Sequence, residues 1–249
     1  MSRKARLRRR RRPPMVRLRR FWMPIVIGTA LLIGIVVVAA MWPGFDPRRV
    51  VVSGNHRVAR GEILARAAIA PHESIWLQSP RSIARRIEAI PYIDTATVHR
   101  IAPATVTIAV AERAPFAVVQ SGDRVAVVDR ALRALAPPAV GASWPTFVIG
   151  PGARLAPGDF VATHEAVQLR EAYDAMTARG VVPVRLAFDR YGGLVATMRD
   201  GLRLMLGGQN DMGRKLSLVD AILAQVIGHQ RRVAAIDLRA PATPVVVYR

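Results

Sequence analysis

The side chains best suited to catalysis or metal binding are few and scattered along this chain of 249 residues. The five histidines are far apart, and none has the H-E-x-x-H type of spacing that places zinc ligands on one helix face. They are His56, His72, His99, His164 and His229. No cysteine is present, which excludes a thiol nucleophile, a cysteine-based zinc site and disulfides. We therefore predict no metal site and no cofactor.

Two other features resemble catalytic or nucleotide-binding patterns only superficially. Asp123 and Asp129 suggest an acid–base pair, but an aspartate beside Gly122 or Arg130 is typical of turns. Gly207-Gly208 precedes an expected helix, yet the segment lacks both the G-x-x-x-x-G-K-[ST] and the G-x-G-x-x-G patterns. No serine lies in a G-x-S-x-G motif. The sequence thus predicts a protein that is not an enzyme and takes no small-molecule substrate.

The most informative feature is the charge pattern at the start of the chain. Residues 1–20 contain eleven Lys or Arg and no acid, and residues 21–42 contain no charged side chain. Twenty-two helical residues extend about 33 Å, enough to cross a hydrocarbon core of about 30 Å. Trp22 and Trp42 stand at the two ends, where indole rings favour the membrane–water interface. We predict a transmembrane helix at residues 21–42.

The basic tail, residues 1–20, sets the expected topology. The positive-inside rule places it in the cytoplasm and residues 43–249 outside, as in a single-pass type II protein of the inner membrane. A cleaved signal peptide is the main alternative, although its apolar region is usually about 7–15 residues long. Nucleic-acid binding is a second alternative, but residues 43–249 carry only +9 of the formal net charge of +20. We expect Arg3–Arg20 to contact anionic lipid head groups and not nucleic acid.

The rest of the chain predicts an α+β protein in which a linker at 43–47 precedes two domains, 48–115 and 116–249. The first has the order β-α-α-β-β, with helices at 60–69 and 80–90 and strands at 50–52, 93–101 and 104–112. The second is a mixed, mainly antiparallel β-domain with helices at 163–179 and 211–227. Its strands are expected at 116–120, 125–129, 147–150, 184–189, 194–198, 202–206, 234–238 and 244–248. Ser79 and Thr163 are expected to cap helices.

Several short motifs follow one another along the chain. They are Val52-Ser53-Gly54-Asn55, Gly61-Glu62-Ile63-Leu64, Ala102-Pro103 through Glu112-Arg113-Ala114-Pro115, Gly201 through Gly207, Lys215-Leu216 and Ile236-Asp237-Leu238-Arg239. In this order they resemble the FtsQ/DivIB family of bacterial cell division proteins. The first half is similar to the FtsQ-type POTRA domain and the second to the family's β-domain. The resemblance covers residues 21–249.

The resemblance implies a non-enzymatic scaffold of the division machinery, concentrated at the septum. Such a protein links cytoplasmic and extracytoplasmic division proteins and binds FtsB/DivIC-like and FtsL-like partners. The alternative is a POTRA-containing component of envelope assembly or secretion that binds unfolded polypeptide. An anchored cell-wall enzyme is a further alternative.

The resemblance also implies where partners bind. In the family a segment of FtsB adds a strand beside the last strands of the β-domain, a case of β-augmentation. This predicts a partner-binding edge at Val245, Val246, Val247 and Tyr248, with Tyr248 covering the apolar side of the docked strand. Arg239 is expected to pair with an acidic partner residue. The alternative interpretation of these residues is a strand that only closes the sheet and an ordinary solvated arginine. Glu112, Arg113 and Pro115 are expected at the domain junction.

Overall fold

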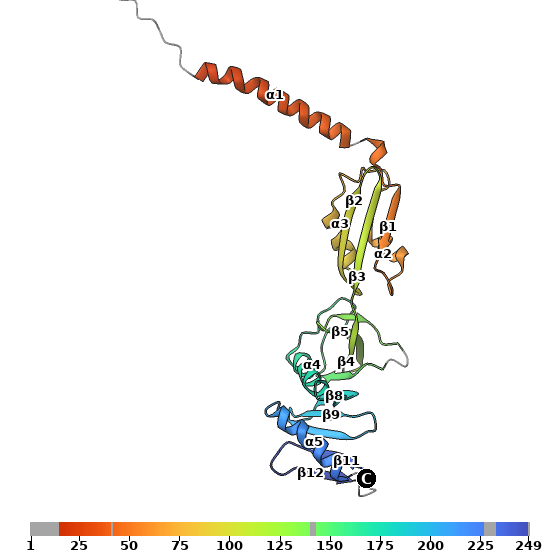
Figure 1. The fold of residues 1–249 in the computed structure, drawn as a ribbon, viewed down its shortest axis with the longest axis vertical. Coiled ribbons are helices and arrows are strands. Elements are labelled where there is room, and N and C mark those ends of the chain that lie inside the picture. Colours follow the sequence, from red (N-terminus) through yellow and green to blue (C-terminus); the bar gives the residue numbers. More distant parts are fainter. Residues whose placement is uncertain (1–14, 41, 140–142, 227–232, 249) are drawn as a thin grey trace, which may run out of the picture.

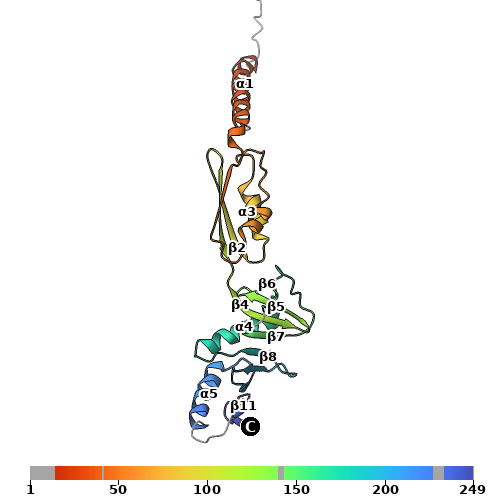
Figure 2. The same ribbon diagram turned by 90° about the vertical axis from the view of Figure 1, so that its right-hand side faces the viewer.

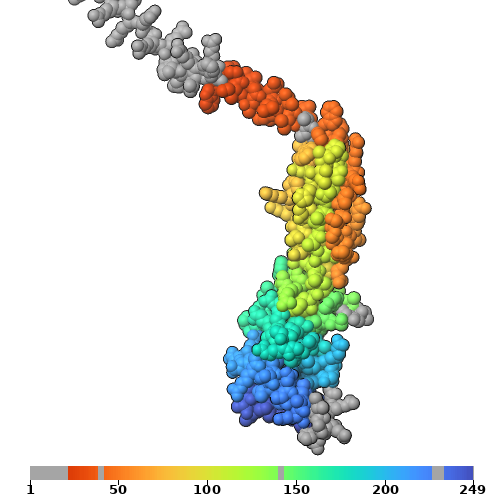
Figure 3. Space-filling view, in the orientation of Figure 1, coloured from red at the N-terminus to blue at the C-terminus, as the bar shows by residue number. Residues whose placement is uncertain are grey.

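The computed structural model describes residues 15–40, 42–139, 143–226 and 233–248. The protein is elongated: helix α1 lies at one end, a small domain follows, and a larger domain lies at the other end (Figures 1 and 2). The space-filling view shows the two domains in contact end to end (Figure 3). The tail residues 1–14 of the predicted lipid contact lie outside the described residues.

Helix α1 (Met15–Ala40) contains most of the apolar run. Its large side chains from Trp22 to Val38 are 48–69% exposed. A short 3-10 turn, η1 (Pro43–Phe45), follows and begins at Pro43, the first residue of the expected linker. Within the described part of the chain, no helix meets the combined length and apolarity that a membrane span requires. The transmembrane helix at 21–42 therefore stays a prediction.

The first domain packs two short helices on one face of a three-stranded sheet with the order β1-β3-β2 (Figures 1 and 2). Its elements are β1 (Arg49–Ser53), α2 (Arg60–Ala67), α3 (Pro80–Glu88), β2 (Ile93–Ile101) and β3 (Thr105–Glu112). β1 runs parallel to β3, and β2 runs antiparallel to it. The predicted order β-α-α-β-β is confirmed.

Local sequence explains the elements of this domain. The Ser79 hydroxyl accepts a hydrogen bond from the Ser82 N–H at 3.4 Å, and Pro80 occupies the first turn of α3. Isoleucines at helical spacing, Ile83 and Ile87, turn into the core and are at most 3% exposed. In β3, Val106, Ile108 and Val110 alternate inward, as their period of two predicts.

The second domain is built on one mixed sheet with the strand order β12-β11-β10-β9-β8-β7-β4-β5-β6 among the described residues. Its first strands are β4 (Pro115–Ser121), β5 (Arg124–Asp129), β6 (Ala134–Ala136) and β7 (Thr146–Ile149). The later strands are β8 (Arg185–Phe188), β9 (Leu194–Thr197), β10 (Arg203–Gly207), β11 (Val233–Asp237) and β12 (Val245–Tyr248). Parallel pairs join β4 to β7, β7 to β8 and β10 to β11, and the other pairs are antiparallel.

Helices α4 (His164–Thr177) and α5 (Met212–Val226) supply the rest of the core of this domain. One row of residues crosses the sheet in register and lies in the same core as buried side chains of both helices. The row is Val119, Phe147, Leu186, Ala196, Leu204, Ile236 and Val246. This row therefore ties β12 to the same core as β7.

The Thr163 hydroxyl caps α4, as expected, by accepting a hydrogen bond from the Ala166 N–H at 3.2 Å.

The element boundaries differ from the sequence prediction in small ways. The sequence does not predict β6 as a strand. Its three residues are followed by Pro137-Pro138 and show no strand pattern, so a loop is expected there. α2 ends at Ala67, and Ala68 adopts a left-handed conformation with φ of 45°. α4 ends at Thr177, two residues before the expected end. Residue 227, the expected end of the last helix, lies outside the described residues.

Candidate partner-binding edge

The residues expected to bind a partner lie at one edge of the large sheet, at the end of the molecule opposite α1 (Figure 1). β12 pairs antiparallel with β11, and Val245, Val246 and Val247 lie opposite Asp237, Ile236 and Ala235. In the part of the chain that the structure describes, β12 is the terminal strand of the sheet. β-branched side chains suit such a strand because they are stiff and pack well on a pleated surface.

The two faces of β12 have different surroundings. Val246 is half-buried and packs against the core that the two helices cover. Val245 and Val247 point to the other face and are 56% and 46% exposed. Tyr248 is 40% exposed. The edge thus combines one side chain that holds the strand in place with two apolar side chains in contact with solvent.

Arg239 lies just beyond β11 and is engaged within its own chain. Its Nε donates to both carboxylate oxygens of Asp237 at 3.0 Å, and its backbone N–H donates to Oδ1 at 3.0 Å. The hydrogen bond from the Arg239 side chain lowers the pKa of Asp237 below its usual value. The same bond raises the pKa of Arg239. An acidic partner residue would therefore meet a guanidinium that already shares its charge with Asp237.

The turn between β8 and β9 adds further charge near this edge. The Asp189 carboxylate accepts from the N–H groups of Gly193 and Tyr191 at 2.8 Å each. These two hydrogen bonds lower the pKa of Asp189, and the charge of Arg239 contributes to the same shift. Arg190 stacks on the ring of Tyr191, with its Cζ 4.8 Å from the ring centroid. The turn therefore presents an ordered cation–π pair at the surface.

Arg113 lies where the two domains meet. Its guanidinium pairs with Asp94 in β2 and with Asp129 at the end of β5, at 2.8 Å in each case. Asp129 also accepts from the Arg133 N–H at 2.8 Å. Pro115 begins β4 and lies opposite Asp129 in the sheet. One arginine thus connects the first domain with the second.

Glu112, the neighbour of Arg113, has a different environment from the one we expected. Its carboxylate accepts from the backbone N–H groups of His56, Arg57 and Val58 at 2.8–2.9 Å, which holds the loop after β1. Burial raises the pKa of Glu112, but the hydrogen bonds from Val58, Arg57 and His56 outweigh it and leave the pKa below its usual value. These contacts lie within the first domain.

The features that resembled chemical sites have structural surroundings. Asp123 lies in the turn before β5 and Asp129 at its other end, so the strand separates the two carboxylates. The Lys215 ammonium, on a side chain that is almost fully buried, folds back and donates to the carbonyls of Leu206 and Gly208 at 2.7 and 2.6 Å. Among the described residues, no three His, Asp or Glu side chains group together as metal ligands would.

Two site features could not be found by inspecting the sequence. The role of Asp129 at the junction depends on Arg113, which is 16 residues away. The hydrogen bonds of the buried Lys215 ammonium cannot be recognised from nearby residue types, because their acceptors are backbone carbonyls, which every residue has. The Asp237–Arg239 pair did have a signal, namely an acid and a base two residues apart at the end of a strand.

The chain was compared with known proteins. Residues 45–113 match the family described as the POTRA domain of FtsQ type. The chain is 26% identical to the cell division protein FtsQ of Bradyrhizobium diazoefficiens over 205 residues, 82% of this chain and 57% of that protein. It is 35% identical to the FtsQ of Syntrophotalea carbinolica over 112 residues, 41% of this chain and 40% of that protein.

A third relative is the FtsQ of Mycolicibacterium smegmatis, 30% identical over 109 residues, 44% of this chain and 32% of that protein. The matched segments thus span about half the length of these curated relatives or less. The POTRA match agrees with the unit from η1 to β3 that the structure forms. The comparisons confirm the resemblance of this chain to the FtsQ family of cell division proteins, with an FtsQ-type POTRA domain at residues 45–113.

Proposed function

We propose that this protein is a non-enzymatic scaffold of the bacterial division machinery, anchored in the inner membrane and concentrated at the septum. Its FtsQ-type POTRA domain and its similarity to FtsQ proteins over 82% of the chain support this assignment. In this proposal it links cytoplasmic and extracytoplasmic division proteins. The two domains, at 48–115 and 116–249, lie on the extracytoplasmic side.

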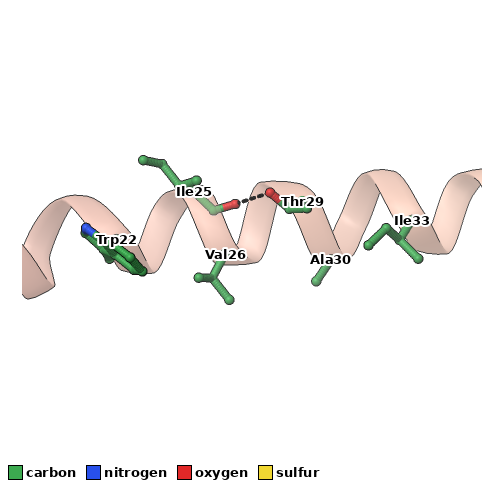
Figure 4. Close-up of a pocket in the computed structure, with 6 residues that line it drawn as sticks. All are labelled: Trp22, Ile25, Val26, Thr29, Ala30 and Ile33. Atoms are coloured by element: carbon green, nitrogen blue, oxygen red, sulfur yellow. Dashed lines mark hydrogen bonds between the residues drawn. The ribbon is translucent and has the colours of Figure 1, made fainter.

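In this proposal α1 is the membrane anchor, with Trp22 and Trp42 at the two interfaces. Support comes from the side chains on its surface, which are apolar along the stretch drawn in Figure 4. Apart from the indole N–H of Trp22 at one end, the polar side-chain group in this stretch is the Thr29 hydroxyl, which donates to the Ile25 carbonyl at 2.7 Å (Figure 4). A hydroxyl satisfied by its own helix suits a lipid environment, where an unpaired polar group costs several kcal/mol. The basic residues 1–20 remain in the cytoplasm and contact anionic lipid.

The β12 edge is the proposed binding site for FtsB/DivIC-like and FtsL-like partners. The observation that carries this proposal is the terminal position of β12, with Val245 and Val247 exposed beside it. An edge strand offers backbone N–H and C=O groups, and a partner strand can pair with them. Val245, Val247 and Tyr248 then contact alternate side chains of the added strand. Arg239 contributes a positive charge beside this edge for an acidic partner residue.

A pair of proline variants tests the strand addition. Along a β-strand, successive N–H groups point to opposite sides, so Val246→Pro and Val247→Pro remove donors on opposite sides of β12. The variant that loses a bond to β11 should be less stable, and the other should unfold like the wild type. Binding of the full chain to an FtsB-like coiled-coil protein should weaken about ten-fold or more in the stable variant.

The possible outcomes distinguish the scaffold role from the mechanism of strand addition at β12. Unchanged binding by the stable variant would place the partner site elsewhere on the protein and leave the scaffold role standing. Failure of the folded wild type to bind FtsB-like and FtsL-like proteins would count against the scaffold role. It would favour the POTRA-containing envelope assembly component, for which binding of an unfolded polypeptide is the direct assay.

A further inference from the structure

The end of the first domain nearest α1 is formed by three segments, residues 43–49, 73–79 and 100–104, which we call the α1-side tip (Figures 1 and 2). Backbone hydrogen bonds join the three segments. The Ile75 N–H donates to the Phe45 carbonyl at 2.9 Å, and the Arg48 N–H donates to the Ala104 carbonyl at 2.9 Å. The tip is therefore a single structured surface that follows the helix directly.

Large apolar side chains are exposed on this tip. Trp76 is 41% exposed, and Leu77 and Ile101 are 51% exposed each, although their neighbour Ile75 is fully buried. Trp42, between α1 and η1, is 65% exposed, and its ring lies close to Gly44. Single exposed apolar residues are ordinary on protein surfaces, but several at one end suggest a contact surface.

Trp76 is held in a defined position. Its ring meets Phe45 edge-on, with the centroids 6.4 Å apart. The Arg100 guanidinium stacks over the same ring, with Cζ 5.1 Å from the centroid, and donates to the Trp76 carbonyl at 3.1 Å. An indole paired with a cation and left partly exposed has the amphipathic character that favours a membrane–water interface.

The charges around the tip favour an anionic surface. Arg48 and Arg49 are exposed beside η1, and Arg100 is half-buried over Trp76. The acids in the same segments are the half-buried Asp46 and the exposed Glu73. Arginine heads with apolar stems, next to Trp, Leu and Ile, are the combination found where proteins lie on anionic lipid.

We propose that the α1-side tip docks in the head-group layer of the bilayer that α1 crosses, with Trp76, Leu77 and Ile101 inserted and Arg48, Arg49 and Arg100 contacting lipid phosphates. This rests on the proposed membrane anchor. The commitment to lipid follows from continuity, because the tip begins directly after Trp42, the expected interface residue. A tether this short keeps the tip at high effective concentration near the surface. Docking would restrict the angle of the whole elongated domain pair to the membrane.

The absence of native cysteines allows probes to be placed one at a time in the full chain. Leu77→Cys and Ile101→Cys carry a fluorophore on the tip, and Val182→Cys carries it on a 55% exposed site in the second domain. Thr29→Cys reports on α1. The labelled chains are reconstituted in nanodiscs of phosphatidylethanolamine and phosphatidylglycerol that contain nitroxide lipids. We expect head-group nitroxides to quench the probes at 77 and 101, acyl-chain nitroxides to quench the probe at 29, and neither to quench the probe at 182.

Substitutions distinguish docking from mere proximity to the anchor. In the Ile101→Cys chain, Trp76→Gln should lower head-group quenching about two-fold or more, and so should Arg48→Gln with Arg49→Gln. Tyr191→Gln, at a 75% exposed site of the second domain, is the matched control and should change nothing. If Trp76→Gln disturbs folding, Leu77→Gln replaces it, because Leu77 is more exposed.

Each result has a distinct meaning. Quenching at 29 without quenching at 77 and 101 would overturn the docking and leave the anchor in place. Quenching at 101 that Trp76→Gln, Leu77→Gln and the arginine changes leave untouched would also overturn it. Lack of quenching at 29 would overturn the anchor, and the docking with it.

Discussion

The Arg113 guanidinium donates to the Asp129 carboxylate at 2.8 Å and so joins the residue after β3 to the end of β5. The two side chains are 14% and 7% exposed, and a second carboxylate, that of Asp94, binds the same arginine from β2. A small apolar cluster lies nearby, in which Tyr92 of the first domain packs against Val118, Val127 and Leu135 of the second. The junction is therefore held by both an ion pair and apolar contacts.

Replacing Arg113 should be costly, because Asp129 would stay buried without its cation. We expect Arg113→Ala to lower the free energy of unfolding by about 3 kcal/mol, as measured by urea denaturation. Arg130→Ala is the control: Arg130 pairs with Asp174 at 2.9 Å, but the two side chains are 69% and 36% exposed. Its loss should cost about 1 kcal/mol or less. Equal losses in the two variants would contradict a special role for Arg113.

Glu112→Gln should weaken the first domain in a pH-dependent way. Because folding lowers the pKa of Glu112, its charge stabilises the protein above the ordinary value of 4.5, and this contribution is lost as the pH falls through the folded pKa. We expect a loss of about 1 kcal/mol at neutral pH, since the carboxylate is only half-buried and water screens its charge.

The Glu112 prediction is checked by thermal unfolding of wild type and variant from neutral to acidic pH. The difference in melting temperature between wild type and Glu112→Gln should close at acidic pH, where the Glu112 carboxyl group is protonated in both the folded and the unfolded protein. Glu171→Gln, at a 59% exposed side chain, should show no such convergence. A gap that stays constant with pH would contradict the role of the Glu112 charge.

Gly54 should tolerate no side chain. Its φ is +84°, and a Cβ atom there would lie 2.1 Å from the Val110 carbonyl oxygen, a backbone atom that cannot move aside. We expect Gly54→Ala to destabilise the first domain by about 3 kcal/mol or more. Gly192 has a similar φ of +81° but open space around it, so Gly192→Ala should cost about 1–2 kcal/mol. Comparable losses of stability in the two variants would show that the backbone strain at positive φ causes the destabilisation, and not the clash with the Val110 carbonyl oxygen.

Arg239→Gln should affect the edge more than the fold. Without the guanidinium, the pKa of the Asp237 carboxyl should rise toward its usual 3.8, which NMR titration of the aspartate carboxyl carbons would detect. Under the proposed function, binding of an FtsB-like protein should also weaken, with the melting temperature nearly unchanged because the pair is partly exposed. Arg154→Gln, at an exposed site, serves as the control. Normal partner binding by Arg239→Gln would remove this residue from the proposed contact.

Short-range patterns made much of the fold predictable. The cap at Ser79, the isoleucine spacing of α3 and the alternation in β3 each involve residues within one element, so each can be read from the sequence. The resemblance to FtsQ was equally readable, and the comparisons confirm that resemblance. The membrane helix at 21–42 and the partner role of β12 remain predictions.

The sequence by itself determined the local elements, their order and the family resemblance, because helix caps, hydrophobic periods and turn residues act over a few neighbouring positions. Only the tertiary structure decided what depends on distant residues. It placed β12 at the sheet edge, paired Arg113 with Asp129, turned Glu112 to the loop after β1 and folded Lys215 onto backbone carbonyls. It also brought Phe45, Trp76 and Arg100 together at one tip. Such contacts are set by how the sheets and helices pack, and no local pattern encodes them.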